Sequence, residues 1–446
     1  MAMELSRRAL LAQVAFPAPA RKNILLIAVD DLNTDLGCYG HPLVQTPHLD
    51  GLARRGVRFD HAYCNYPVCN PSRSSLLSGR YPEQTGVLDN RENPHQKLPG
   101  VAFLPAYLRQ RGYFTAGLGK IYHDGMDASD DWDLFVNPKG SADVNRGEGR
   151  NLTDGKFPYF HWVASEAPED EHPDGQIAAE AVKLLQQPRS KPFFLAVGFR
   201  KPHDRYIAPK KYFDLYPLDR MPPAVGPADN AGDIPPMAYP QQNLKLGVAE
   251  AKEFRRAYWS CISFMDAQVG KVLAALDRSG QRDSTLVVFF SDHGLHLGEH
   301  DWWNKVALWE RTTRVPFIAA GPMVRDPGRA CTSIVELVDI FPTLTSFAGL
   351  PTAPQQVGRS ILPALSEPRA SWERTAYTMV LRPGGKKGRA LRTARFRYVE
   401  WDERKGGVEL YDHDSDPGEF RNLANDAAYA GHRQSLQAAL AGRVPQ

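Results

Sequence analysis

The chain has 446 residues, of which 42% are hydrophobic and 24% are charged, and its formal net charge is +3. This composition is typical of a folded globular protein, and the small net charge gives no reason to expect a nucleic-acid or polybasic membrane surface. No apolar run approaches the roughly 20 residues that cross a bilayer, so no membrane span is expected. The 5 cysteines form no CxxC pair, which argues against a disulfide framework or a standard zinc site.

The N-terminal segment has the order of a short export signal. Arg7 and Arg8 precede the apolar run 9–16, and small residues follow at 18–20. A twin-arginine signal with a cleavage site has this order, and a weakly amphipathic leader fits it too. We therefore expect residues 1–22 to be a leader or export signal. The protein would then be periplasmic or secreted, with a cytoplasmic location as the alternative.

Apolar runs without polar alternation predict strands that are buried on both faces. They lie at 23–29, 114–117, 192–199, 286–290 and 315–320. Helical spacing of apolar residues occurs between them, at 49–55, 176–187 and 250–276. This alternation predicts an α/β sandwich around a mostly parallel sheet.

Two polar or proline-rich segments, 141–173 and 216–242, are predicted to be long surface insertions. After Leu350 the pattern changes to short antiparallel strands and a closing helix. The strands are predicted at 377–381, 390–401 and 408–411, and the helix at 427–440. We therefore expect a catalytic domain over 23–350 and a smaller C-terminal subdomain over 351–446.

Ionisable side chains follow four of the predicted strands. They are Asp30 and Asp31 after the first, Lys120 and His123 after the second, 200–203 after the third, and Asp292 and His293 after the fourth. Ligands of open parallel sheets bind outside the carboxyl ends of the strands, so these side chains are expected to line one crevice. Three carboxylates at one place would repel each other unless a hard divalent cation binds them, and oxygen ligands favour calcium or magnesium over zinc.

The segment Cys69-Asn70-Pro71-Ser72-Arg73 predicts the start of a helix. Asn70 can cap a helix and Pro71 suits a first turn. Cys69 would then lie at a helix N-terminus, where backbone amides favour an anion. From these residues alone, both a small buried side chain and a thiolate nucleophile remain open.

This segment, with Leu77-Ser78-Gly79-Arg80 behind it, resembles the signature of the type I sulfatases. The similarity covers about Asn23 to Asn425 and is greatest to iduronate-2-sulfatase-like members, in the segments 198–203, 266–270 and 291–300. Active-site positions of the family are matched in order by Asp30, Asp31, Cys69, Arg73, Lys120, His123, His203, Asp292, His293 and Lys305.

The resemblance implies an alkaline-phosphatase-like fold and the hydrolysis of sulfate monoesters. It implies that a maturation enzyme oxidises Cys69 to Cα-formylglycine. The hydrate of this aldehyde would be held by Arg73 and by a bound Ca²⁺ or Mg²⁺ ion. The ligands of that ion would be Asp30, Asp31, residue 69, Asp292 and His293. Lys120, Lys305 and His203 would offset charge on the sulfuryl oxygens. His203 or Lys305 would protonate the leaving oxygen, and His123 would take a proton from the hydrate.

The chain departs from the family pattern at two positions. Many sulfatases have Asn where this chain has His293, and imidazole is a poor calcium ligand, so direct metal contact by His293 stays open. His296 stands where the iduronate enzyme has another residue, which leaves the sugar open. A basic stretch of Arg382, Lys386, Lys387 and Arg389 fits either an anionic glycan or a solvated loop.

The expected substrate is a sulfated sugar, cleaved by an iduronate-2-sulfatase-like exo-sulfatase, and small alkyl or aryl sulfates remain open. Two other functions fit the sequence. One is a phosphate or phosphonate monoester hydrolase of the same superfamily. The other is a glycan-binding pseudo-enzyme in which Cys69 stays unmodified.

Overall fold

A computed structural model describes residues 22–127, 129–223, 226, 233–240, 246–354, 356–370 and 372–444. The predicted export signal, apart from Lys22, therefore lies outside the described residues, as does much of the segment 216–242. Within the described ranges, no helix combines the length and the apolar character that a bilayer span needs.

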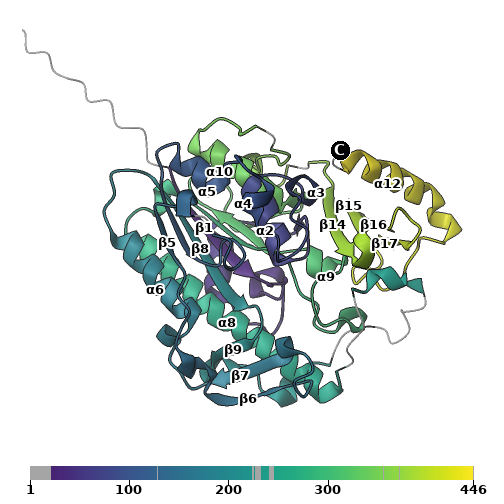
Figure 1. Cartoon of the computed structure of the whole chain (residues 1–446), viewed down its shortest axis with the longest axis horizontal. Coiled ribbons are helices and arrows are strands. Elements are labelled where there is room, and N and C mark those ends of the chain that lie inside the picture. Colours follow the sequence, from purple (N-terminus) through teal and green to yellow (C-terminus); the bar gives the residue numbers. More distant parts are fainter. Residues whose placement is uncertain are drawn as a thin grey trace, which may run out of the picture.

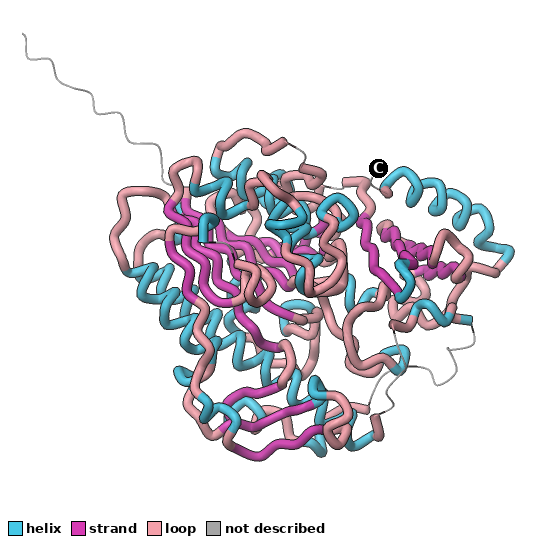
Figure 2. Tube along the Cα trace, viewed as in Figure 1, coloured by secondary structure: helices cyan, strands magenta, loops and turns pink. Residues whose placement is uncertain are grey.

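A large twisted sheet forms the centre of the molecule (Figures 1 and 2). Its strands run in the order β12-β2-β11-β10-β1-β8-β4-β5. Their bounds are β1 Asn23–Asp30, β2 Val57–Phe59, β4 Phe114–Gly119, β5 Leu134–Val136, β8 Phe193–Pro202, β10 Thr285–Ser291, β11 Phe317–Ala320 and β12 Arg329–Cys331. β1 pairs in parallel with β8 and β10, whereas β11 is antiparallel to β10 and β2. The predicted mostly parallel sheet is confirmed, with β11 as an antiparallel strand inside it.

Helices cover both faces of this sheet because its central strands are apolar on both faces. In β1, Leu25, Ile27 and Val29 pack into one core and Ile24 and Leu26 into the other. The first core contains side chains of α1 (Pro47–Arg55), α6 (Pro173–Gln186) and α8 (Val248–Arg278). The second contains side chains of α2 (Cys69–Ser78), α5 (Leu104–Arg109) and α10 (Ile340–Ala348).

The segment predicted as a long surface insertion at 141–173 contains two strands. β6 (Gly147–Asn151) and β7 (His161–Ser165) form a small sheet with β9 (Tyr206–Pro209), away from the central sheet (Figure 1). These strands were not predicted, because β7 pairs in parallel with a strand about forty residues further along the chain. Such a long-range pairing leaves no local sequence pattern.

The C-terminal part forms an antiparallel sheet in the order β14-β15-β16-β17, covered by α12 (Figure 1). The bounds are β14 Ala376–Arg382, β15 Lys386–Arg392, β16 Phe396–Trp401, β17 Gly407–Asp412 and α12 Ala430–Arg443. The single strand predicted over 390–401 is a hairpin of β15 and β16. This sheet also contacts the segment before α2, since Met379 donates its backbone N–H to the Asn65 carbonyl at 3.0 Å.

Short elements complete the described chain. They are β3 Ala62–Tyr63, α3 Pro82–Thr85, α4 Pro94–Lys97, α7 Lys210–Phe213, α9 Glu310–Thr313, β13 Val335–Glu336 and α11 Leu362–Ser366.

Candidate active site

The carboxylates predicted to meet in one crevice come together at the adjacent ends of β1 and β10. The parallel register pairs Val29 with Ser291, so Asp30, Asp31 and Asp292 follow at the same edge. Asp31 has a left-handed backbone with φ of 62°, which is uncommon outside glycine. Its N–H donates to Asp292 Oδ1 at 3.2 Å and its carbonyl accepts from the Tyr258 hydroxyl at 2.7 Å. These bonds hold the turn that brings the carboxylates together.

Cys69 is the first residue of α2 and is fully buried. The cap prediction for Asn70 is wrong, because the N-cap position is Val68 and makes no side-chain cap. The Asn70 side chain instead donates to the carbonyls of Asp89 and Glu92, at 2.9 and 2.7 Å. Cys69 still lies at a helix N-terminus, as predicted, but the loop around residue 90 fixes that end.

Cations and imidazoles surround the Cys69 sulfur. Sγ lies 3.2 Å from Lys305 Nζ, 3.3 Å from His293 Nε2 and 3.8 Å from Asp31 Oδ1. Burial raises the pKa of the Cys69 thiol. The positive charges of Lys120, Lys305 and His293 outweigh burial and hold that pKa well below its usual value. The surroundings of residue 69 therefore favour an anion.

Each of the three carboxylates has a cationic partner. Lys120 pairs with Asp30, and Lys305 Nζ lies 2.7 and 3.0 Å from the two oxygens of Asp31. Arg73 Nε donates to Asp292 Oδ2 at 2.7 Å. Arg73, Lys120 and the carboxylates are almost completely buried, so these pairs are little screened by solvent.

The donor set fits a hard divalent cation. Asp30, Asp31, Cys69 and His293 each place one potential ligand atom within 4.8 Å of the others. Asp30 Oδ1 is buried and accepts no hydrogen bond among the described residues, and its nearest charged partner is Arg73 Nη2 at 3.4 Å. Asp292 Oδ1 lies 3.8 Å from His293 Nε2, beside this group. Carboxylate oxygens with one imidazole suit calcium or magnesium better than a thiolate-rich zinc set.

His203 and His123 lie at the rim of the cluster. His203 Nε2 is 3.9 Å from Asp31 Oδ2, and its Nδ1 donates to the Asp204 carbonyl at 2.7 Å. Burial lowers the pKa of His203, but the charges of Asp31 and Asp30 outweigh burial and raise that pKa to about 9. His123 Nδ1 is buried without a hydrogen-bond partner in the described chain.

A cavity of about 470 Å³ opens from this cluster, with Asp30, Lys120 and His203 in its wall. We call it the crevice. The rest of its wall comes from the segments 139–145, 172–174 and 200–205, with Asp124, Ile207 and Phe264. The sequence placed His203 there but gave no sign of the contribution from 139–145, because that segment is distant in the chain and lies outside the predicted strands.

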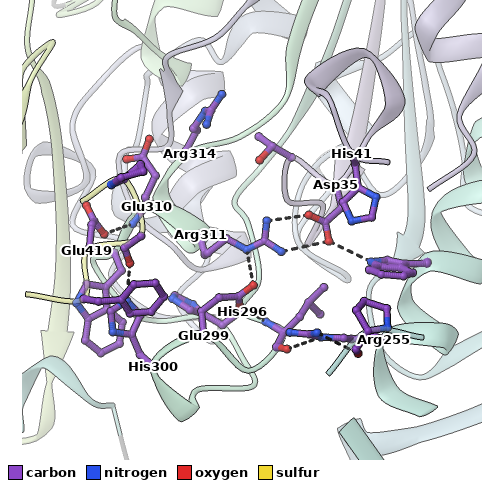
Figure 3. A pocket seen from close by; sticks show the side chains of 18 of the residues that line it. Asp35, His41, Arg255, His296, Glu299, His300, Glu310, Arg311, Arg314 and Glu419 are labelled. Atoms are coloured by element: carbon purple, nitrogen blue, oxygen red, sulfur yellow. Dashed lines mark hydrogen bonds and ion pairs between the residues drawn. The ribbon is translucent and has the colours of Figure 1, made fainter. Parts of the chain in front are cut away.

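A second cavity of about 490 Å³ lies elsewhere (Figure 3). Its wall contains His296, the position where the chain departs from the iduronate pattern, and none of the predicted catalytic residues. Charges in this wall pair with one another: Arg311 lies 2.8 Å from Asp35 and 3.1 Å from Glu299. His296 is fully buried and does not line the crevice.

The basic stretch at 382–389 belongs mainly to β14 and β15 rather than to a loop. Arg382 is buried and donates to backbone carbonyls, and Arg389 lies 3.6 Å from Glu83. None of the four basic residues of this stretch lines the crevice.

Comparisons with known proteins show the family of the chain. The Sulfatase family model matches residues 22–350, and the model "N-sulphoglucosamine sulphohydrolase, C-terminal" matches residues 298–445. The iduronate 2-sulfatase of Mus musculus is 32% identical, with 93% of this chain and 93% of the mouse protein covered. A sulfatase of Formosa agariphila is also 32% identical, over 94% of this chain and 86% of that protein.

The structure of a 2-O GAG sulfatase is 26% identical in sequence and superposes with a TM-score of 0.77 over 95% of this chain and 91% of that one. Catalytic sulfatases therefore share both sequence and fold with nearly all of the described chain. The chain belongs to the sulfatase family and is a sulfuric ester hydrolase.

Proposed function

We propose that this sulfatase hydrolyses sulfate monoesters of a sugar through the hydrate of a formylglycine made from Cys69. The observation that carries the proposal is the setting of Cys69. Its side chain lies at the N-terminus of a buried helix, within 3.2 to 3.8 Å of Lys305, His293 and Asp31. A formylglycine-generating maturation enzyme is the partner that this proposal requires.

Asp30, Asp31, residue 69, Asp292 and His293 would hold the divalent cation, calcium or magnesium. When bound, it would polarise the sulfate and lower the pKa of a hydroxyl of the hydrate. The grouping of four potential ligand atoms, from Asp30, Asp31, Cys69 and His293, supports this assignment.

The side chains around residue 69 have separate parts in the reaction. One hydroxyl oxygen of the hydrate attacks sulfur, and the bond between sulfur and the sugar oxygen breaks. Lys120, Lys305 and His203 offset the charge on the sulfuryl oxygens. Arg73 fixes Asp292 through its 2.7 Å hydrogen bond.

Two proton transfers complete the cycle. His203, whose Nε2 lies 3.9 Å from Asp31 Oδ2, or Lys305 would protonate the leaving sugar oxygen. His123 then takes the proton of the second hydroxyl. Sulfate leaves and the aldehyde returns, a route that an unmodified cysteine or a serine would lack. Addition of one water to the aldehyde restores the hydrate.

The finer assignments belong to the same proposal. The similarity to iduronate 2-sulfatase favours exo-cleavage of a sulfated uronic acid or related sugar. The catalytic domain would span 23–350 and the C-terminal subdomain 351–446, and the enzyme would be periplasmic or secreted.

A phosphate or phosphonate monoester hydrolase is the second candidate. The phosphonate monoester hydrolase of Agrobacterium radiobacter superposes with a TM-score of 0.81, over 95% of each chain, but at 24% identity the likeness shows the fold alone. The sulfate reaction is favoured by the 32% identity to sulfatases over more than nine-tenths of this chain.

The test compares hydrolysis of 4-nitrophenyl sulfate with that of 4-nitrophenyl phosphate, using protein made with a maturation system. Mass spectrometry of the tryptic peptide 59–73 reports the state of Cys69. We expect formylglycine at 69 and a higher kcat/KM for the sulfate. An unmodified thiol in all molecules would sink the mechanism, and a preference for the phosphate would favour the second candidate.

A further inference from the structure

A buried tyrosine of α8 contacts the turn that carries Asp31. Tyr258 lies in the first half of that helix and is fully buried. Its hydroxyl donates to the Asp31 carbonyl at 2.7 Å and accepts the backbone N–H of Asn33 at 2.9 Å. A tyrosine hydroxyl can donate one hydrogen bond and accept another, so this single side chain satisfies two backbone groups of the turn.

The turn requires support because of its backbone conformation. Asp31 has φ of 62°, in the left-handed region that residues other than glycine seldom adopt. A residue stays in this region only where its surroundings hold it there. The hydroxyl binds the carbonyl of Asp31 itself and the N–H two residues later. It therefore restrains the backbone torsion angles that set the direction of the Asp31 side chain.

The direction of the Asp31 carboxylate affects the whole catalytic cluster. Its Oδ1 lies 2.7 Å from Lys305 Nζ, 3.3 Å from His293 Nε2 and 3.8 Å from the Cys69 sulfur. Its Oδ2 lies 3.9 Å from His203 Nε2. One carboxylate thus approaches side chains from four other segments of the chain, and a rotation of the turn would change all of these distances.

Tyr258 differs in kind from the other contact of this turn. The Asp31 N–H donates to Asp292 Oδ1 at 3.2 Å, but Asp292 belongs to the same group of carboxylates and would itself respond to a cation. The Tyr258 ring instead packs edge to face against Tyr206, with 6.1 Å between the ring centres. Its position is therefore set by the packing of α8 and not by the charges of the cluster.

We propose that Tyr258 is a positioning residue that holds the Asp31 carboxylate in place for the divalent cation. The inference rests on the proposed function, because it takes Asp31 as a ligand of that cation. A turn that already has its binding conformation loses less free energy to reordering when the ion binds. Without the hydroxyl, fewer molecules would have the competent turn, and the apparent Kd for the cation would rise in inverse proportion.

The variant Tyr258→Phe tests this role, because it removes the hydroxyl oxygen and keeps the ring. Isothermal titration calorimetry measures Ca²⁺ binding to chelator-treated protein without any substrate, with Mg²⁺ titrated in parallel. We expect the Kd for the cation to rise about tenfold, because two buried backbone groups lose their partner in the free turn. At saturating cation, we expect kcat for 4-nitrophenyl sulfate to return to within about threefold of wild type, because the bound ion selects the competent turn.

Tyr216→Phe is the matched control. The Tyr216 side chain is also buried, and its hydroxyl shares a hydrogen bond of 2.6 Å with Ser263 of α8 and accepts the Gln45 N–H at 2.9 Å. The control therefore removes the same atom and the same number of hydrogen bonds, and neither partner belongs to the catalytic cluster. We expect its Kd for the cation to equal that of wild type. Mass spectrometry of the tryptic peptide 59–73 checks that conversion of Cys69 is equal in the three proteins.

The outcomes separate this role from the proposed function. Equal Kd values in wild type and Tyr258→Phe would overturn the positioning role and leave the proposed function intact. So would a loss of kcat that saturating cation does not restore. A Tyr258→Phe protein that melts far below Tyr216→Phe at saturating cation would make the hydroxyl a general support of the fold, which also overturns the assignment. A wild-type protein that binds neither Ca²⁺ nor Mg²⁺ would overturn the metal assignment of the proposed function, and the role of Tyr258 with it.

Discussion

The guanidinium of Arg382 donates a hydrogen bond to the carbonyl of Val306 at 3.0 Å. Val306 directly follows Lys305 and has φ of 71°, an outlier for a β-branched residue. Its N–H donates to the Pro67 carbonyl at 3.2 Å. The strained turn that presents Lys305 is thus held on one side by the C-terminal sheet and on the other by the segment before Cys69.

Replacing Arg382 with methionine should lower kcat for 4-nitrophenyl sulfate by about tenfold or more, with a smaller change in KM. The guanidinium also donates to the carbonyls of Met237 and Ala238, and each carbonyl left unpaired costs about 1–3 kcal/mol. Lys305 would lose its fixed position relative to Asp31. Arg395→Met, in the turn between β15 and β16, is the control, because this half-exposed arginine pairs with Asp412 and Asp414 and not with the Val306 carbonyl. A KM effect without a kcat effect would contradict this positioning.

Lys305→Met should reduce kcat by about 10²–10³, the usual effect of losing one donor to a developing oxyanion. The reason is the direct contact of its ammonium with Asp31 and the residue 69 side chain. Steady-state kinetics with 4-nitrophenyl sulfate measure the change. Lys386→Met, at an exposed position of β15, should retain wild-type kcat. Retention of activity in Lys305→Met would remove this lysine from the mechanism.

Cys69→Ala should abolish hydrolysis while leaving the fold intact, because the side chain is small and its loss opens little space. Cys64→Ala is the control within the same tryptic peptide. The Cys64 thiol is buried and makes only a 3.7 Å contact with the Thr312 carbonyl. We expect modification at 69 and none at 64, read by mass spectrometry. Activity in Cys69→Ala would show that another nucleophile operates.

Addition of Ca²⁺ to chelator-treated protein should raise the melting temperature. A ligand that binds the folded state alone stabilises it by mass action, by about 2.7 kcal/mol at one hundred times Kd. The increase should be much reduced in Asp31→Asn, since an amide oxygen replaces a charged ligand. Differential scanning calorimetry with Ca²⁺ and Mg²⁺ in parallel separates the two cations. An unchanged melting temperature with both would argue against the metal assignment.

Glu169 should contribute to stability at neutral pH but not in acid. Burial raises the pKa of its carboxyl, but hydrogen bonds from Lys211, Lys271 and Tyr212 outweigh burial and hold that pKa well below the usual 4.5. A depressed folded-state pKa gives stabilisation that is present above about pH 4.5 and is lost as the pH falls. The free energy of unfolding of Glu169→Gln, measured in urea, should therefore be lower than that of wild type at pH 7. At pH 3 the two proteins should have similar free energies of unfolding. A difference independent of pH would contradict the charge effect.

The sequence predicted the central sheet because apolar runs and helical spacing are local patterns. It also predicted the grouping of Asp30, Asp31, Asp292 and His293, because strand ends of a parallel sheet meet at one edge. The β7–β9 pairing and the reversed direction of β11 could not be predicted, since both depend on contacts between distant segments. The sequence also did not predict how the N-terminus of α2 is fixed, or that Lys139 lines the crevice, because both depend on contacts between distant segments.

Because Cys69 is completely buried in the folded protein, an enzyme that modifies it would have to act before folding is complete. The segment before Cys69 is hydrogen-bonded to β14, which follows about 310 residues later in the chain: the backbone N–H of Met379 donates to the Asn65 carbonyl. A ribosome that adds about 5–20 residues per second needs roughly 15 to 60 seconds to make that distance. The nascent chain thus exposes Cys69 for a limited interval, and the speed of synthesis sets how long a modifying enzyme has to act.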